Sequence, residues 1–368
     1  MTPSHRASAP RSAVSAAVMT HPDRTAQAAR IANATGLTHV TVATDPEPEG
    51  PPTALRSARV AFGAASAHDT DHHVVLQDDV RLADGFAASV ERILAAHPEA
   101  PVSLFVEWGS RTAVLARWAV YTGVGAVPVV NPYVPTVALA LPRALSVELG
   151  RFLEQEELAG LPDDRAVLRF MRERGITPLA AVPNPVEHED HPSLVGNDEH
   201  GARRSVCFSA VERTGGVLDP PRALPFLRWN LGTPVLVDLD HDVPEAHRPL
   251  DAVLAGWGAT HEDLATALKA HHGGLSGVIP EPYLTSVWHT AVADGAILET
   301  RWPGTVSALR SRTDEPAVER ALASLVPGAL RTFVDVDRLA EHRARVVAMT
   351  LGALEHGAEH CRVPPEEL

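Results

Sequence analysis

The chain has 368 residues, 45% of them hydrophobic, and a formal net charge of −14 at pH 7. A surface this acidic repels nucleic acid, which excludes general binding of DNA or RNA. At about 100–200 residues per domain, the length predicts two domains, each with a core of its own.

The first 210 residues alternate strand-like and helix-like segments. Strands are predicted at residues 13–19, 38–44, 73–76, 102–106 and 176–182, and helices at residues 23–35, 54–67, 84–96, 142–158 and 162–173. A further strand-like run lies before residue 142. This alternation is typical of an α/β fold in which helices flank a mainly parallel sheet.

The composition shifts near residue 215, where glycine and proline are frequent. Beyond this linker we expect one strand at residues 233–239 and helices at residues 262–271, 316–325 and 337–355. The interpretation is a catalytic domain at residues 13–212 and a mixed or mainly helical accessory domain at residues 213–368. No motif assigns a function to the second domain.

Cysteine usage and hydropathy predict a cytoplasmic protein without a membrane span. Cys207 and Cys361 lack the spacing of a metal site, and two isolated cysteines are usually reduced. No apolar run reaches the ~20 residues that a spanning helix needs. An apolar stretch near the N-terminus imitates a secretion signal, but it is only about eight residues long. We therefore expect residues 1–12 to form a disordered tail.

Polar residues follow three of the predicted strands. The segment from His21 to Arg24 follows the first strand, Asp45 the second, and Gln77-Asp78-Asp79 the third. In parallel sheets, ligands bind beyond the carboxyl ends of the strands. These three segments therefore predict one binding rim.

The Asp78-Asp79 pair is the sharpest chemical signal in this rim. A strand delivers two carboxylates to a tight turn, where hard oxygen ligands suit Mg²⁺ or Mn²⁺. A diphosphate would supply further oxygen ligands. The alternative is an exposed turn that ends the strand and caps a helix.

Residues 72–80, followed by Gly85-Phe86, resemble the metal-binding strand of GT-A glycosyltransferases. The similarity is greatest to the inverting group that includes the lipooligosaccharide galactosyltransferase type. It spans about residues 13–208 and includes three other segments in the order of the family: residues 18–24, the Asp163-Asp164 pair, and residues 184–196. Gln77 departs from the pattern, because an acid usually holds its place.

The resemblance implies a metal-dependent, inverting transferase that takes a nucleoside-diphosphate sugar, foremost a UDP-sugar. Asp79 would be the direct ligand of Mn²⁺ or Mg²⁺, with Asp78 assisting at the metal or the ribose. His188 matches a histidine that completes the metal shell, and Ser193-Leu194-Val195-Gly196 matches the tail of that motif. The alternative for His188 is a surface loop rich in histidine.

The second acidic pair implies the proton acceptor. The resemblance makes Asp164 the general base that accepts the proton of the attacking group, beside Asp163. A helix N-terminus favours the ionised form of such a base. The alternative is capping of the helix by Asp163, and the two interpretations are compatible.

The remaining candidates would contact the nucleotide. Thr20 and His21 belong to a turn that lies against the nucleotide in the family, and the planar guanidinium of Arg24 suits a phosphate. Asp45 would contact the base or ribose. The last two candidates are basic. Arg59 would face the nucleotide, and Arg203 would pair with the diphosphate.

Two other functions stay open at this point. The chain could be a catalytically silent scaffold that binds a partner through its C-terminal domain. It could instead be a nucleotidyltransferase, which shares the sheet and the use of a metal. The sequence identifies neither the acceptor nor the oligomeric state, so a homo-oligomer also stays open.

Overall fold

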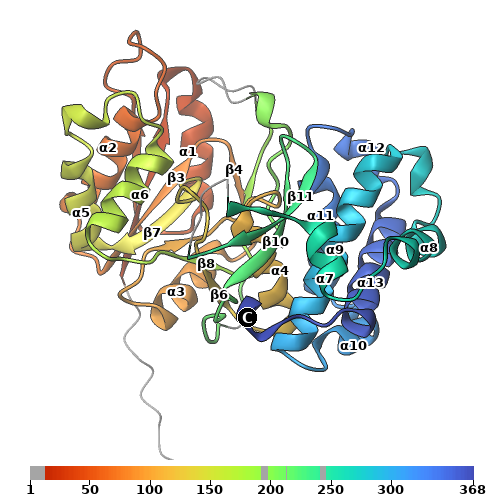
Figure 1. Cartoon of the computed structure of the whole chain (residues 1–368). Helices are drawn as coiled ribbons and strands as arrows, with labels where there is room; N and C mark the ends of the chain where they lie inside the picture. The colour runs from red at the N-terminus through yellow and green to blue at the C-terminus, as the bar shows by residue number, and fades with distance from the viewer. Residues whose placement is uncertain (1–12, 192–197, 213, 241–245) are drawn as a thin grey trace, which may run out of the picture.

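A computed structural model describes residues 13–191, 198–212, 214–240 and 246–368 (Figure 1). The predicted tail at residues 1–12 and the Ser193-Leu194-Val195-Gly196 segment lie outside the described residues. The predicted α/β class is confirmed. A seven-stranded sheet has the order β2-β1-β3-β7-β5-β8-β6. Its strands are β1 (Val14–Thr20), β2 (His39–Thr44), β3 (His72–Gln77), β5 (Val102–Ser103), β6 (Ala126–Pro128), β7 (Ala138–Pro142) and β8 (Leu179–Ala181).

The sheet is mainly parallel, as the sequence predicts. β1 pairs in parallel with β2 and β3, and β5 pairs in parallel with β8. β7 is antiparallel to both β3 and β5, so β5 and β8 run in the same direction as β1. Only β7 and β6 oppose that direction among the strands of this sheet. The carboxyl ends of β1, β2 and β3 therefore meet at one edge.

Alternate residues of the central strands supply two separate cores, because successive side chains of a strand point to opposite faces. Ala16 and Val18 of β1 pack with α1 (Thr25–Ala34) and α3 (Phe86–Ala96). Ala17 and Met19 pack on the other face. There they meet α2 (Leu55–Gly63), α5 (Arg143–Phe152) and α6 (Asp163–Glu173). Figure 1 shows the sheet between these two helical layers.

A small antiparallel ladder brings a segment that is distant in sequence to the end of β3. It pairs β4 (Val80–Leu82) with β9 (Val186–His188), and Val80 lies opposite His188. The backbone N–H of Glu189 also donates to the carbonyl of Asp79 at 2.7 Å. His188 is thereby fixed beside the turn that follows β3.

The second half is mainly helical and begins with a small antiparallel sheet. The sheet contains β10 (Ala223–Arg228), β11 (Thr233–Asp238) and β12 (Arg248–Pro249). The helices of the second half are α7 (Leu250–Gly256), α8 (His261–His271), α9 (Glu281–Arg301), α10 (Thr305–Leu309), α11 (Pro316–Leu330), α12 (Val336–Ala340) and α13 (Arg343–His360).

Short 3₁₀ helices occur in both halves of the chain, at Pro22–Arg24, Ala64–Ala67, Glu156–Leu158, Asp198–His200, Leu275–Gly277, Arg310–Arg312 and Pro365–Glu367.

Packing continues across the predicted domain boundary at residues 212 and 213. The largest core cluster joins α4 (Arg111–Thr122) to α9, α11 and α13. Helix α4 belongs to the first half by sequence, yet Trp118 packs edge-on against Trp302 at 6.0 Å. The two-domain division stays a prediction, and the two halves share one core.

The sequence patterns miss α4 and α9 because both helices are buried on nearly every side. In α4 every residue from Thr112 to Tyr121 is buried, and in α9 the same holds from Val287 to Leu298. Without a polar face, the 3.6-residue period that signals a helix disappears. Among the described residues, no helix has the combination of length and apolar character needed to cross a membrane.

Helices α9 and α13 approach so closely that glycine is required where they cross. A Cβ atom at Gly357 would overlap the carbonyl oxygen of Val292. Gly256 is a matched control, since it also lies in a helix and a Cβ atom there would meet nothing within 4 Å.

We expect Gly357→Ala to lower the free energy of unfolding by about 1–3 kcal/mol, because the added methyl group forces the helices apart. Gly256→Ala should be neutral or stabilising by up to about 1 kcal/mol. Urea unfolding followed by circular dichroism measures both. Equal effects of the two substitutions would show that the helix crossing tolerates the methyl group.

Candidate active site

A cavity of about 750 Å³ opens at the carboxyl ends of β1, β2 and β3. Most of the residues singled out from the sequence line it: Thr20, His21, Arg24, Asp45, Gln77, Asp78, Asp79, Asp163, Asp164 and Arg203. The segments that carry them come from across 180 residues of sequence, and the parallel strands bring them together. The predicted rim therefore exists as a cavity.

Asp78 is held against the first strand. Its Oδ2 accepts a hydrogen bond from Thr20 Oγ1 at 2.5 Å, and its Oδ1 accepts one from Arg24 at 3.3 Å. Burial raises the pKa of the Asp78 carboxyl, and the contacts with Thr20 and Arg24 oppose that rise. Both carboxylate oxygens have protein partners, so Asp78 ties the end of β3 to the turn after β1.

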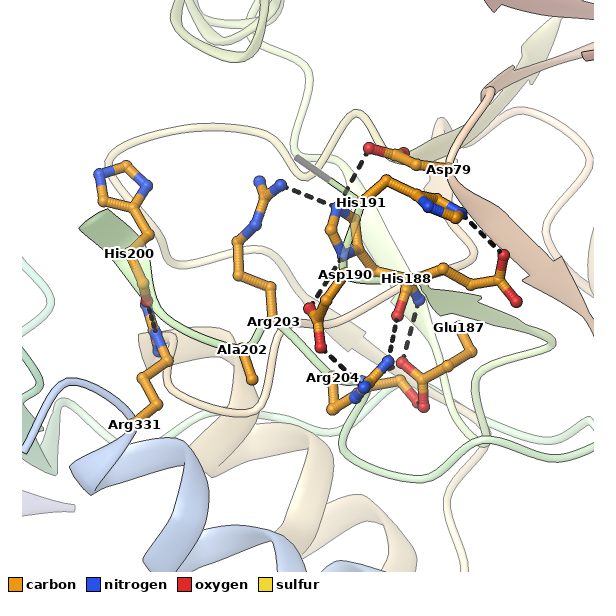
Figure 2. A network of polar contacts seen from close by, with 12 residues as sticks. Asp79, Glu187, His188, Asp190, His191, His200, Ala202, Arg203, Arg204 and Arg331 are labelled. Carbon is orange, nitrogen blue, oxygen red and sulfur yellow. Dashed lines mark hydrogen bonds and ion pairs between the residues drawn. The ribbon is translucent and has the colours of Figure 1, made fainter. Parts of the chain in front are cut away.

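Asp79 has other neighbours and lies beside His188 and Arg203 (Figure 2). Burial raises the pKa of Asp79, but the contact with His188 and the charges of Arg203 and Arg24 outweigh burial and lower it. The Oδ1 atom is buried and has no hydrogen-bond partner among the described residues. Asp79 is thus an ionised carboxylate with a free oxygen at the cavity.

His188 is buried, and its Nε2 atom lies between Arg203 and Asp79. Arg203 Nη2 is 2.8 Å from this nitrogen, and a guanidinium can only donate, so this contact is a hydrogen bond when Nε2 carries no proton. The same nitrogen lies 3.5 Å from Asp79 Oδ2. A carboxylate oxygen and an imidazole nitrogen therefore converge beside the positive charge of Arg203 (Figure 2).

This donor pair would fit Mn²⁺, which accepts both carboxylate and imidazole ligands, once Arg203 turns away from His188 Nε2 and frees its one lone pair. It also fits Mg²⁺ through the carboxylate. No cluster of three or more histidine, cysteine, aspartate or glutamate ligands occurs in the part of the chain that the structure describes. A metal held by Asp79 and His188 would take its other ligands from a bound substrate or from water. Gln77 lines the cavity beside this pair with an uncharged amide in place of an acid.

The second acidic pair lies at the N-terminus of α6. Burial raises the pKa of Asp163, which hydrogen-bonds with Thr136. Burial and the neighbouring Asp163 raise the pKa of Asp164 to about 6. Its Oδ1 atom has no hydrogen-bond partner among the described residues. At neutral pH Asp164 is mainly ionised and is suited to accept a proton.

Arg56 holds the place at the cavity that the sequence assigns to Arg59. Helix α2 contributes Arg56 and Ser57 to the lining, and Arg59 is not part of it. Arg56 donates to both carboxylate oxygens of Asp45 at 2.9 Å. It also donates to the carbonyl of Glu47 at 2.8 Å. Asp45 also lines the cavity, and its predicted contact with the nucleotide stays a prediction.

The second half of the chain supplies a wall that the sequence does not reveal. Buried Arg331 forms an ion pair with Glu107 at 2.5 Å and donates to the carbonyl of His200 at 2.7 Å. Its guanidinium also lies over the ring of Trp229 at 4.5 Å. These four residues and Tyr133 line the cavity. No motif marks these five residues, because they come from five separate segments.

Comparison of the sequence with protein-family models and with curated proteins gives no match in either case.

The Asp45–Arg56 pair predicts a pH-dependent contribution to stability. The hydrogen bonds from Arg56 lower the pKa of Asp45, so its stabilising effect is complete above the unfolded pKa of about 3.8 and declines as pH falls through the lowered value. We expect Asp45→Asn to cost about 1.5–3 kcal/mol at pH 7, the range of hydrogen bonds to charged groups. The difference from the parent should shrink in acid.

Urea unfolding at a series of pH values measures this difference. Asp69→Asn is the control, since Asp69 is exposed and makes no hydrogen bond or ion pair with the described residues. A loss at pH 7 no larger than that of Asp69→Asn would contradict the assignment.

Proposed function

We propose that this protein is a metal-dependent glycosyltransferase that moves a sugar from a nucleoside-diphosphate sugar to an acceptor, with inversion at the sugar carbon. The main support is that one cavity is lined both by Asp79, whose carboxylate contacts His188, and by Asp164, whose Oδ1 has no partner among the described residues. These groups suit the two ends of a displacement reaction, a departing diphosphate and an attacking hydroxyl or amine. The resemblance to GT-A enzymes supports the same interpretation.

The donor end of the cavity suits a nucleoside diphosphate. The volume of the whole cavity, about 750 Å³, is in the range of small-molecule sites. Arg24 and Arg203 line it with planar guanidinium groups that can pair with phosphate oxygens. Asp79 and His188 would hold Mn²⁺ or Mg²⁺, which when bound offsets the charge of the leaving diphosphate. A UDP-sugar is the first donor to test.

Asp164 is the proposed general base. Its position at the start of α6 places the carboxylate in the cavity, and its free oxygen can accept a hydrogen bond from an acceptor hydroxyl or amine. In a single displacement the base deprotonates the acceptor while the diphosphate leaves from the opposite face of the sugar. A pKa of about 6 keeps this base ionised at neutral pH.

We expect Asp164→Asn to reduce kcat by about 10²–10⁴-fold, the usual contribution of general base catalysis. Because the ionised form is active, kcat/KM of the parent enzyme should fall as pH is lowered through about 6. The variant should lose this dependence. Initial rates with UDP-sugars between pH 5 and 8 provide the measurement.

Asp84→Asn is the control for this experiment, since Asp84 is exposed and outside the cavity lining. It should leave both the rate and the pH profile unchanged. An Asp164→Asn enzyme with parental kcat would remove Asp164 from the mechanism.

Metal binding can be measured separately from turnover. We expect Asp79→Asn and His188→Ala each to weaken Mn²⁺ binding in the presence of UDP by at least about tenfold, because even the loss of a group that only hydrogen-bonds to a metal ligand costs about 10–100-fold. Electron paramagnetic resonance of free Mn²⁺ reports this affinity. His261→Ala in α8 is the matched control, since His261 is exposed and distant in sequence from the cavity residues.

Assays of the same purified proteins distinguish the proposed transferase from the two alternative functions. Parental Mn²⁺ affinity in both site variants would contradict the proposed ligands. Release of pyrophosphate from a nucleoside triphosphate would identify a nucleotidyltransferase. Failure to bind any nucleoside diphosphate, with or without Mn²⁺, would favour the scaffold.

A further inference from the structure

A second cavity, of about 460 Å³, lies behind the wall of the first. In each of three pairs of sequence neighbours, one side chain lies on the side of the first cavity and the other lines the second cavity. Glu107 and Arg203 line the first cavity, whereas Trp108 and Arg204 line the second. In β9, His188 contacts Asp79 and Glu187 lines the second cavity.

This division follows from extended backbone, in which successive side chains point to opposite faces. Glu107 and Ser205 form an antiparallel bridge between two of these segments. Figure 2 shows Arg203 reaching toward His188 and Asp79 while Arg204 lies beside Glu187. A layer one strand thick therefore separates the second cavity from the proposed active site.

The remaining walls of the second cavity are helical and largely apolar. Helices α11, α12 and α13 contribute side chains without polar atoms, among them Ala323, Pro327, Leu339 and Val346. A concave apolar surface of this size is in the range of small-molecule sites. Its burial by an apolar body would be favourable, at about 25 cal/mol per Å² removed from water.

Three arginines line this cavity, and two of them already have acidic partners. Arg204 forms an ion pair with Asp190 at 2.7 Å, and Arg343 forms one with Glu319. Arg320 of α11 is half-buried and makes no hydrogen bond or ion pair with the residues that the structure describes. Arg320 is thus a cation without a partner at the edge of an apolar space.

The acids of the cavity do not neutralise Arg320. Glu187 is buried and accepts hydrogen bonds from Ser205 N at 2.6 Å, Ser205 Oγ at 3.0 Å and His188 N at 3.0 Å. Asp337 is exposed in the first turn of α12. Glu187 is engaged by its own neighbours and Asp337 lies at the exposed edge, so neither acid pairs with Arg320, and an anion can do so.

We propose that this second cavity is a binding site for an amphipathic organic anion, whose carboxylate or phosphate pairs with Arg320 and whose apolar body packs on α11, α12 and α13. The site does not depend on the proposed transferase activity, since its lining shares no residue with the first cavity. Its position behind His188 and Arg203 makes it separate from the donor site.

Isothermal titration calorimetry of the full-length protein with octanoate and octyl phosphate, below their micelle concentrations, tests the proposal. We expect one site for at least one of these anions. Arg320→Gln should weaken it at least tenfold, which is about 1.4 kcal/mol. Neutral 1-octanol should bind at least tenfold more weakly than the better anion. Comparison of the two anions distinguishes a carboxylate ligand from a phosphate ligand.

Two further variants complete the test. Ala340→Phe places a bulky side chain at an exposed residue of the cavity lining, so it should block binding without straining the core. Arg30→Gln is the charge-matched control, since Arg30 is exposed on α1 and has no partner among the described residues. Its affinity should equal that of the parent.

Each contrary outcome overturns the proposal. Neither anion binding to the parent protein would remove the ligand class. A loss of less than tenfold in Arg320→Gln, or equal binding of 1-octanol, would remove the role of the charge. Parental affinity in Ala340→Phe would place the bound anion elsewhere on the surface. Melting temperatures of all variants confirm that each is folded.

Discussion

The turn after β3 carries two adjacent carboxylates, Asp78 and Asp79, that contact different partners. The proposed site depends on this difference. Thr20 and Arg24 use both oxygens of Asp78, which fixes the turn to the first strand. Asp79 is left with one free oxygen and a position beside His188. An Asp-Asp pair is ambiguous in sequence because two neighbouring acids look equivalent. The fold makes them different by giving each its own set of partners.

The β4–β9 ladder places His188 beside Asp79. It joins residues more than 100 apart in the chain, and its register places His188 opposite Val80. A one-residue shift would turn His188 toward the second cavity and Glu187 toward Asp79, because side chains alternate along a strand. Two acids would then face each other in place of an acid and an imidazole. The chemistry of the proposed metal site is therefore a consequence of strand register.

Sequence reasoning recovered the parts of the molecule that local patterns encode. Alternating strands and amphipathic helices gave the α/β class, and the acidic residues at strand ends gave the rim. It failed where contacts are long-range. Arg56 and Arg59 lie one turn apart on α2, and only the position of Asp45 decides which of them reaches the cavity. Helices α4 and α9 were missed because complete burial removes the periodic pattern.

The second half of the chain was predicted as an accessory domain, yet its side chains form part of the cavity wall. Buried Arg331 pairs with Glu107 of the first half and also donates to carbonyl oxygens of His200 and Gly328. Breaking a buried ion pair by removing one partner typically costs about 3–5 kcal/mol, since the remaining charge stays without compensation. Removal of the Arg331 side chain would impose this cost on Glu107, and separation of the halves would expose the apolar surface of the core cluster that α4 shares with α9 and α11. The shape of the cavity and the stability of the fold thus depend on the same interface.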